Sequence, residues 1–296
     1  MKAPYFSIII PAHNEEEHLP NAINSILVQT EKSFEIIIIL DNCTDDSLNI
    51  AKKYSKTYNN IKYKEAHKGS AAGARNTGIK LAKGKYVIFH DADCYMDSVL
   101  LHNAAKYLED YPIDGLATRT TNTSPKNWIQ RAVATQRAIR WENTVKEGWR
   151  PLMLDKNSGI NVAIMRRDIV NKLGGFNEKI FYFEDNDLTK RFFEAGYDAM
   201  FGPSVIQYHN DPLTLKESIG QCKSIAKGMR LRKSITNGEL VTISSVPINI
   251  FTGIPGAFVF LYFAYKSKDI IGSFYFSVLW TIRSAAKGYY YLFGKF

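Results

Sequence analysis

The first ninety residues alternate strand-like and helix-like segments, and this alternation restricts the fold more than any other feature of the sequence. Apolar runs of strand length occupy residues 5–10, 34–40 and 61–65, and a fourth run ends at residue 90. Helical spacing and helix-start residues predict helices over 15–29, 45–57 and 70–82. Because strands joined through helices form sheets with right-handed crossovers, we expect an α/β fold with a mostly parallel sheet flanked by helices.

The loops after these strands are the expected ligand-binding segments, since open α/β sheets bind ligands beyond the carboxyl ends of their strands. The four loops are Pro11-Ala12-His13-Asn14, Asp41-Asn42-Cys43-Thr44, His67-Lys68-Gly69 and His90-Asp91-Ala92-Asp93. Pro11 is expected to end the first strand, and Asn14 is expected to cap the helix that follows.

The two aspartates of the fourth loop suggest a metal site. Residues two apart on a strand point the same way, so Asp91 and Asp93 are predicted to aim their carboxylates at one site. Such pairs suit Mg²⁺ or Mn²⁺, which bind oxygen ligands. A D-x-D pair alone is weak, because acidic pairs are also common in surface turns. The preceding His90 fits a buried core histidine as well as it fits a ligand.

The second part of the chain has a less regular pattern. It predicts a helix over 98–111, strands near 115–120 and over 159–166, and a turn at Gly174-Gly175. A further helix is expected to open near Phe183. Its first turn carries Glu184, Asp185 and Asp187, where the positive end of the helix dipole favours acids.

Five motifs in this order carry a family resemblance. They are PAHNEE after the first strand, Asp41 after the second, Gly73-Ala74-Arg75-Asn76, the D-x-D pair, and Glu184-Asp185. Over roughly residues 4–235 the chain resembles the family 2 glycosyltransferases, which have the GT-A fold. The resemblance implies an inverting enzyme that uses a nucleotide-diphosphate sugar, with UDP or GDP, and a divalent metal, Mg²⁺ or Mn²⁺. No Q-x-x-R-W motif follows Glu184-Asp185, so we expect a non-processive enzyme.

The resemblance also implies residue roles. Asp185 would be the general base, with Glu184 or Asp187 supporting its position. Asp93 would bind the metal, Asp91 the ribose or the metal, and His209 a metal or phosphate. Arg75 would neighbour the diphosphate and ribose. The remaining residues expected at the nucleotide sugar are Pro11, Ala12, Asn14, Glu15, Asp41 (at the base), Lys68 and Ala92.

Some positions depart from the family pattern. Leu40 stands where the family often has a first aspartate, which leaves Asp41 alone to read the base. Cys43 and Cys94 lie in or beside the nucleotide loops, where glycine, serine or acidic residues are more usual.

Two other functions remain open at this point. A nucleotidyltransferase on a similar sheet would need a glycine- and arginine-rich loop after the first strand, and PAHNEE is not one. A non-catalytic nucleotide-sugar or membrane-binding module would have lost its base. The joint presence of Asp91, Asp93 and Asp185 favours the glycosyltransferase.

Charge and cysteine content restrict the kind of partner and the cellular compartment that we expect for the protein. Of the net charge of +9, +8 comes from residues 216–296, which hold eleven basic and three acidic residues. Such asymmetry indicates a polyanionic partner, and the absence of a nucleic-acid motif argues against nucleic acid. The three cysteines, Cys43, Cys94 and Cys222, lack Cys-x-x-Cys spacing and form an odd number, so we expect reduced thiols in a cytoplasmic protein, with neither a disulfide framework nor a zinc site. No signal peptide is predicted.

The last sixty residues are predicted to associate with a membrane. Residues 241–265 carry no charge, a length that would cross a bilayer, but Pro247, Gly253, Pro255 and Gly256 also suit a bent interfacial hairpin. From residue 270 the pattern predicts an interfacial amphipathic helix. Its apolar face is predicted to comprise Ile271, Phe274, Val278, Ile282, Ala285, Tyr289 and Leu292. Alternatively, these segments pack on the catalytic domain or form a dimer interface.

These predictions combine into a domain scheme. Residues 1–236 form the GT-A domain, with a nucleotide-sugar half (1–120) and an acceptor and base half (121–236). Residues 237–296 form membrane-associating helices. We expect an enzyme at the cytoplasmic face of a membrane, acting on a lipid-linked acceptor or a growing glycan. The oligomeric state is left open.

Overall fold

The computed structural model describes residues 3–122, 124–144, 152–154, 161–211 and 214–235, with short helical pieces at 274–275, 278–280 and 282–283. The chain divides into two compact units. The first comprises residues 1–120, 147–178 and 183–209, and the second comprises 121–146, 179–182 and 210–296. The functional scheme for 1–120, 121–236 and 237–296 stays a prediction.

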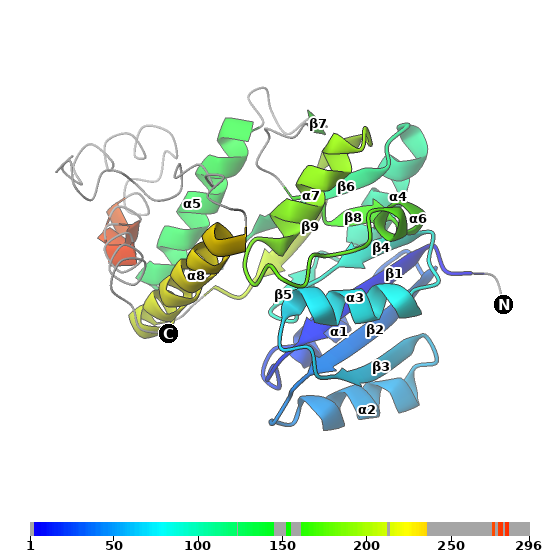
Figure 1. Ribbon diagram of the computed structural model, residues 1–296, viewed down its shortest axis with the longest axis horizontal. Coiled ribbons are helices and arrows are strands. Elements are labelled where there is room, and N and C mark those ends of the chain that lie inside the picture. The colour runs from blue at the N-terminus through cyan, green and yellow to red at the C-terminus, as the bar shows by residue number, and fades with distance from the viewer. Residues whose placement is uncertain are drawn as a thin grey trace. The chain divides into compact units, whose positions relative to one another are not determined.

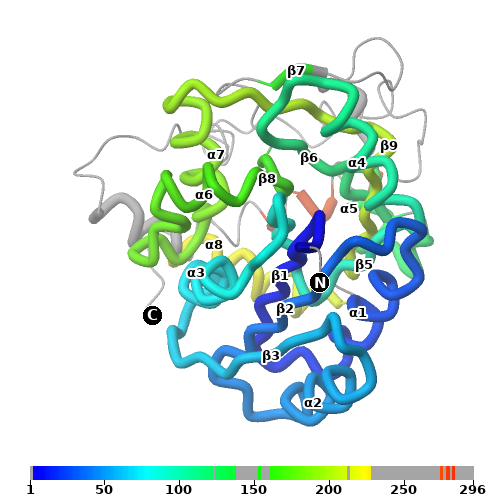
Figure 2. Tube along the Cα trace, turned by 90° about the vertical axis from the view of Figure 1, so that its right-hand side faces the viewer, coloured from blue at the N-terminus to red at the C-terminus, as the bar shows by residue number. Residues whose placement is uncertain are grey.

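The alternation at the start of the chain forms one parallel half of a sheet, as predicted. Strands β1 (Phe6–Ala12), β2 (Phe34–Asp41), β3 (Ile61–Ala66) and β4 (Tyr86–Phe89) are all parallel, and β1 lies between β2 and β4. Their connections contain α1 (Leu19–Leu27), α2 (Ser47–Thr57) and α3 (Ala71–Leu81) (Figure 1). Figure 2 shows β1, β2 and β3 side by side.

The later strands extend the sheet beyond β4 in antiparallel pairs. The strand order is β3-β2-β1-β4-β8-β6-β9-β5, and β7 also pairs with β9. These strands are β5 (Cys94–Met96), β6 (Gly115–Thr121), β7 (Leu152–Leu154), β8 (Ile164–Arg166) and β9 (Ala199–His209). Helices α4 (Leu100–Asp110), α6 (Arg167–Lys172) and α7 (Glu184–Glu194) complete the unit. The sheet is therefore mixed, with its parallel part at the β3 side.

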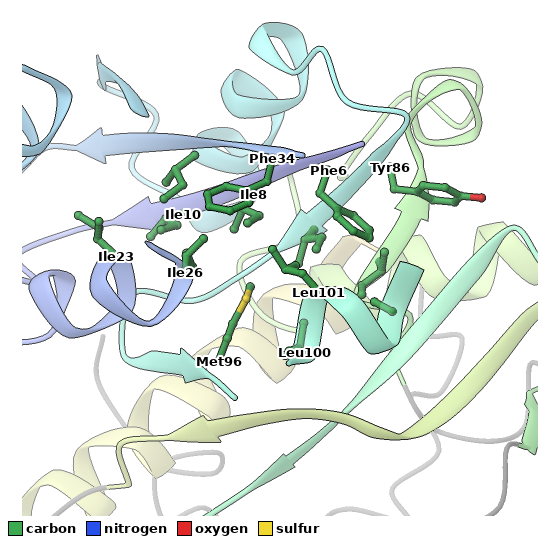
Figure 3. Close-up of a cluster of buried hydrophobic side chains, with 14 of the residues drawn as sticks. Phe6, Ile8, Ile10, Ile23, Ile26, Phe34, Tyr86, Met96, Leu100 and Leu101 are labelled. Atoms are coloured by element: carbon green, nitrogen blue, oxygen red, sulfur yellow. The ribbon is translucent and has the colours of Figure 1, made fainter. Parts of the chain in front are cut away.

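Alternation along β1 builds a core on each face of the sheet. Ile8 and Ile10 pack with residues of α1 and α4 on one face, where Figure 3 shows Ile23, Ile26, Leu100 and Leu101 around them. Ile9 points to the other face and packs with residues of α3, α6 and α7. Because both faces are covered, the central strands carry apolar residues toward both faces, which is how buried parallel strands read in a sequence.

Two predicted boundaries are wrong. Strand β1 does not end before Pro11 but runs through Ala12, and Pro11 pairs with Ile39 of β2. The carbonyl of Ile9 accepts from His90, just after β4 ends. Pro11 has the same parity as Ile9, so its missing N–H faces the side where β4 has stopped and removes no ladder bond.

Helix α1 begins at Leu19, four residues later than predicted, and Asn14 does not cap it. Asn14 instead adopts the left-handed conformation, with φ of 57°. An asparagine tolerates that conformation, and its side-chain oxygen accepts hydrogen bonds from Thr44.

The second unit contains α5 (Trp128–Thr144) and α8 (Leu215–Ile235). Leu279 is buried with Ile129, Ala132 and Val133 of α5, and the rings of Trp128 and Tyr275 lie 6.0 Å apart. Within the ranges that the structure describes, no helix has both the length and the apolar character needed to cross a bilayer. The uncharged segment 241–265 lies outside those ranges.

A buried glutamate joins three segments near the start of the sheet. Glu35 of β2 is 5% exposed and accepts hydrogen bonds from the Ser7 hydroxyl (2.8 Å), the Lys83 backbone N–H (2.7 Å) and the Lys62 ammonium (3.0 Å). Burial alone would raise the pKa of Glu35, but these hydrogen bonds outweigh it and lower the pKa. A folded-state pKa below the unfolded value means that Glu35 stabilises the fold above the unfolded pKa. That stability is lost as pH falls through the folded pKa.

Glu35→Gln is expected to lower the free energy of unfolding at pH 7 by about 1–3 kcal/mol. The neutral amide cannot replace the charged carboxylate that accepts the three hydrogen bonds. The difference from wild type should shrink as pH falls below about 4, where the wild-type carboxylate also protonates. Urea unfolding at pH 7 and at a pH below about 4 measures this difference in the free energy of unfolding. Glu65→Gln, at an exposed position of β3, is the control and should change stability little. An equal difference at both pH values would contradict the assignment.

Candidate active site

The loops after β1 and β2 are tied together by reciprocal hydrogen bonds. The Asn14 side-chain oxygen accepts from the Thr44 backbone N–H (2.7 Å) and hydroxyl (3.3 Å). Glu16 accepts from the Asp46 N–H (2.8 Å), while its own N–H donates to Asp45 (2.9 Å). The predicted site residues of the first loop therefore lie beside the second loop. Ala12 is buried, and Pro11 and Glu15 are half-buried.

Asp41 anchors the loop that leads into α3. Its two carboxylate oxygens accept from the backbone N–H groups of Lys68 (2.6 Å) and Ser70 (3.0 Å). Ser70 in turn caps α3 by accepting from the Gly73 N–H (3.2 Å). Asp41 and Lys68, both predicted at the nucleotide, are thus brought together, with the Asp41 carboxylate engaged by backbone N–H groups.

The D-x-D pair lies in a turn, so the prediction of a straight strand end is wrong. The carbonyl of Asp91 accepts from the Cys94 N–H (3.0 Å), which closes a turn between β4 and β5. Period-two alternation does not hold in a turn, and the two carboxylates have different partners. Asp91 faces Arg75 and Asp93 faces His209, whereas the Ala92 side chain packs in the core.

Arg75 joins the D-x-D turn to the start of α7. Its guanidinium donates to Asp91 (2.7 Å) and to Glu184 (2.6 Å), and it lies over the ring of Phe176 at 5.4 Å. The Arg75 side chain is only 10% exposed. Burial alone would lower the pKa of Arg75, but the two carboxylates outweigh it and raise the pKa.

The pKa of Asp91, the carboxylate that pairs with Arg75, shifts in the opposite direction. Partial removal from water would raise the pKa of Asp91, although the side chain is half exposed. The nearby Arg75 guanidinium outweighs that effect and lowers the pKa of Asp91. The Asp91 carboxylate is therefore held ionised by an arginine.

Asp185, the predicted base, stands in the first turn of α7. The preceding Phe183 is left-handed, with φ of 66°, which is a rare conformation for a bulky residue and turns the chain into the helix. Burial raises the pKa of Asp185, the neighbouring charge of Glu184 adds to the rise, and Arg75 opposes it. Asp185 thus has a higher proton affinity than an ordinary aspartate, while Asp91 has a lower one.

Asn161 is a site residue that the sequence did not reveal. Its amide donates to the Asp185 carboxylate, and its oxygen accepts from the Asn186 side chain (2.9 Å). The only signal was one polar residue within the apolar run 159–166, and that run was read as strand. Asp187 points elsewhere and pairs with Arg191 (2.8 Å), which holds the carbonyls of Leu173 and Gly175.

Asp93 and His209 form a candidate metal site. The two side chains approach to 3.4 Å, and the ligand atoms of Asp93, Cys94 and His209 all lie within 4.8 Å of one another. Burial and the charges of Asp93 and Asp91 raise the pKa of the adjacent Glu15 to about 7. A carboxylate, an imidazole and a concentration of negative charge fit a divalent cation. Asp91, also predicted as a ligand, is engaged by Arg75.

His90 is a core residue of this turn. It is fully buried, and its Nε2 donates to the Cys94 carbonyl (3.1 Å). Burial lowers the pKa of His90. Of the two interpretations that the sequence left open, the structure supports the structural one.

A mixed sheet whose parallel half ends in acidic loops defines an α/β fold of the GT-A type. The chain belongs to glycosyl transferase family 2, whose model matches residues 7–174. It is therefore a glycosyltransferase, and the resemblance found in the sequence is confirmed.

Relatives and solved structures agree with this assignment. The glycosyltransferase AglE of Haloferax volcanii is 28% identical over 211 residues, which cover 70% of this chain and 67% of that protein. The mannosyltransferase PcManGT from Pyrobaculum calidifontis, solved in complex with GDP-Man and Mn²⁺, has a TM-score of 0.63 at 18% identity. The match covers 100% of this chain and 89% of that chain.

A second structural relative supports the same fold. S. aureus TarS 1–349, in complex with UDP-GlcNAc, has a TM-score of 0.56 at 16% identity, covering 96% of this chain and 91% of that chain. At these identities, both structures inform on the fold alone.

Proposed function

We propose that the enzyme transfers a sugar from a UDP- or GDP-sugar to an acceptor hydroxyl by one direct displacement that inverts the anomeric centre. The observation that carries the proposal is Asp185, a carboxylate with a raised pKa held by Asn161 beside the Arg75–Asp91 pair. A base is most effective when its pKa lies near the working pH, and burial moves Asp185 in that direction.

In the displacement, each group has one role. The acceptor oxygen forms a bond to the sugar carbon while the bond from that carbon to the diphosphate oxygen breaks. The nucleoside diphosphate leaves with the bonding electron pair. Asp185 takes the acceptor's proton, and the hydrogen bonds that its two carboxylate oxygens accept from the Asn161 amide and the Asn186 N–H fix its orientation. Glu184 and Arg75 position Asp185 and Asp91.

The donor would occupy the carboxyl ends of the parallel strands. Asp91, ordered by Arg75, would contact the ribose, and the residues that would contact the nucleotide are Pro11, Ala12, Asn14, Glu15, Asp41 and Lys68. Asp93 and His209 would hold a divalent cation, Mg²⁺ or Mn²⁺. When bound, that ion would offset the negative charge that grows on the leaving diphosphate.

Asp185→Asn is expected to lower turnover about 10²–10⁴-fold, because an amide cannot accept the proton, while donor affinity stays almost unchanged. Asn161→Ala should reduce turnover less, because it frees the base without removing it. Release of UDP or GDP from sugar nucleotides, with Mn²⁺ present, measures both. Glu194→Gln, exposed at the end of the same helix, is the control. Normal turnover in Asp185→Asn, or an NMR spectrum showing a retained anomeric configuration, would contradict the mechanism.

The acceptor is proposed to be a lipid-linked saccharide or a growing glycan at the cytoplasmic face of a membrane. Two features of the second unit support this. Helix α8 exposes Lys223 and Lys227, and basic residues near an anionic surface contribute about 1 kcal/mol each. Phe274 and Val278, from the predicted apolar face, are 54% and 38% exposed, whereas Leu279 packs against α5.

Substitution of both exposed residues, Phe274→Glu with Val278→Glu, should weaken co-sedimentation with phosphatidylglycerol vesicles, because burial of apolar side chains in the interface is lost. The full chain is used throughout. Val28→Glu replaces an apolar residue that is 63% exposed in the first unit and is the matched control. Equal vesicle binding by all three proteins, or no binding by wild type, would overturn the membrane assignment.

A further inference from the structure

Cys94 lies beside the candidate metal ligands and has no part in the chemistry described so far. It directly follows Asp93, and in the antiparallel ladder of β5 and β9 it stands opposite His209. Residues opposite each other in such a pair project their side chains from the same face of the sheet. The thiol and the imidazole therefore face the same site from two strands.

The backbone holds this thiol in a fixed place. The Cys94 N–H donates to Asp91, and its carbonyl accepts from the buried His90 ring. The next pair of the ladder, Tyr95 and Tyr208, stacks with ring centroids 5.0 Å apart. Cys94 itself is buried. Its side chain is thus positioned before any ligand binds, which is what a selective metal site requires.

The three side chains lie close enough together to share one metal ion. One Asp93 oxygen lies 3.6 Å from the Cys94 sulfur, and the other lies 3.4 Å from His209 Nε2. Metal–ligand bonds of about 2.0–2.3 Å in a tetrahedral site separate neighbouring ligand atoms by roughly 3.4–3.6 Å. The two approaches involve different Asp93 oxygens, and the ligand atoms of all three residues lie within 4.8 Å of one another, so a small movement of the side chains would place them around one ion.

We propose that Cys94 is an additional, thiolate ligand of this metal site and raises its affinity for Zn²⁺, Co²⁺ or Cd²⁺ relative to Mg²⁺, which departs from the expectation, drawn from cysteine spacing, that the cysteines form no zinc site. Mg²⁺ prefers oxygen ligands in octahedral geometry, whereas thiolate and imidazole suit softer cations. Binding releases the thiol proton to solvent. This inference rests on the proposed metal site at Asp93 and His209, and it adds a property that the carboxylate and imidazole alone do not give.

Cobalt spectroscopy tests the ligand directly. The full chain, stripped of metal with a chelator, is titrated with Co²⁺ alone, and the near-ultraviolet thiolate-to-cobalt charge-transfer band is recorded. Wild type and Cys43→Ser should show the band. Cys94→Ser should bind Co²⁺ through Asp93 and His209 without it, and Asp93→Ala should lose most of the binding.

Affinities measured by calorimetry test the selectivity. Cys94→Ser should weaken Cd²⁺ binding at least about tenfold and leave Mg²⁺ binding unchanged within about twofold, because serine keeps an oxygen but not a soft ligand. Cys94→Ala, a second variant without the thiol, should behave in the same way. Circular dichroism shows whether both variants remain folded. Cobalt binding by wild type without the band, or a band that persists in Cys94→Ser, overturns the proposal.

Nucleotide release measured beside Co²⁺ binding separates this inference from the proposed function. If wild type releases UDP or GDP with Mn²⁺ but binds no Co²⁺ in the titration, the thiolate site is wrong and the glycosyltransferase proposal stands. If neither activity nor Co²⁺ binding is found, the metal site itself is wrong.

Discussion

The arrangement of the site depends on one buried guanidinium. Arg75 comes from the first half of the chain, yet it pairs with Glu184, more than a hundred residues later, and with Asp91 in the D-x-D turn. Removing one partner from a buried ion pair typically costs about 3–5 kcal/mol, because the remaining charge is left uncompensated. Arg75 therefore fixes the turn after β4 relative to the start of α7. The proposed base, Asp185, follows directly after Glu184.

This geometry gives similar acids different properties. Asp91 is kept ionised by Arg75, whereas Asp185 and Glu15 have raised pKa values because burial and neighbouring carboxylates disfavour their charged forms. Carboxylates whose pKa values are pushed apart by their surroundings are typical of sites that combine binding with proton transfer. A cation bound at Asp93 and His209 would also change these pKa values, since its positive charge would offset the repulsion between Glu15 and the nearby aspartates.

The sequence predicted the parallel half of the sheet because local patterns determine it. Strands such as 34–40 are apolar apart from Glu35, and the intervening helices have clear periodicity, so β1 to β4 and α1 to α3 appear where expected within a few residues. Strand β9 was missed, because Gly202 and Pro203 interrupt its pattern. Its register beside β5 depends on pairing between residues more than a hundred positions apart, and local hydrophobic periodicity carries no information on such long-range pairing.

The same limit applies to the site. Motif order identified Asp91, Asp93, Asp185 and His209, but not their partners. The turn that separates Asp91 from Asp93, the clamp through Arg75 and the contact of Asn161 with Asp185 are tertiary features. Arg75 was expected near the diphosphate, and the structure shows that its guanidinium is engaged by two carboxylates of the chain itself.

A double-mutant cycle between Arg75 and Glu184 tests most directly whether this clamp organises the site. Urea unfolding without donor or metal is measured for wild type, Arg75→Met, Glu184→Gln and the double variant. The clamp predicts that each single change is destabilising and that the double variant loses less than their sum, with a coupling of about 1–3 kcal/mol. Additive losses within about 0.5 kcal/mol would show that Arg75 and Glu184 act independently, and would contradict the account.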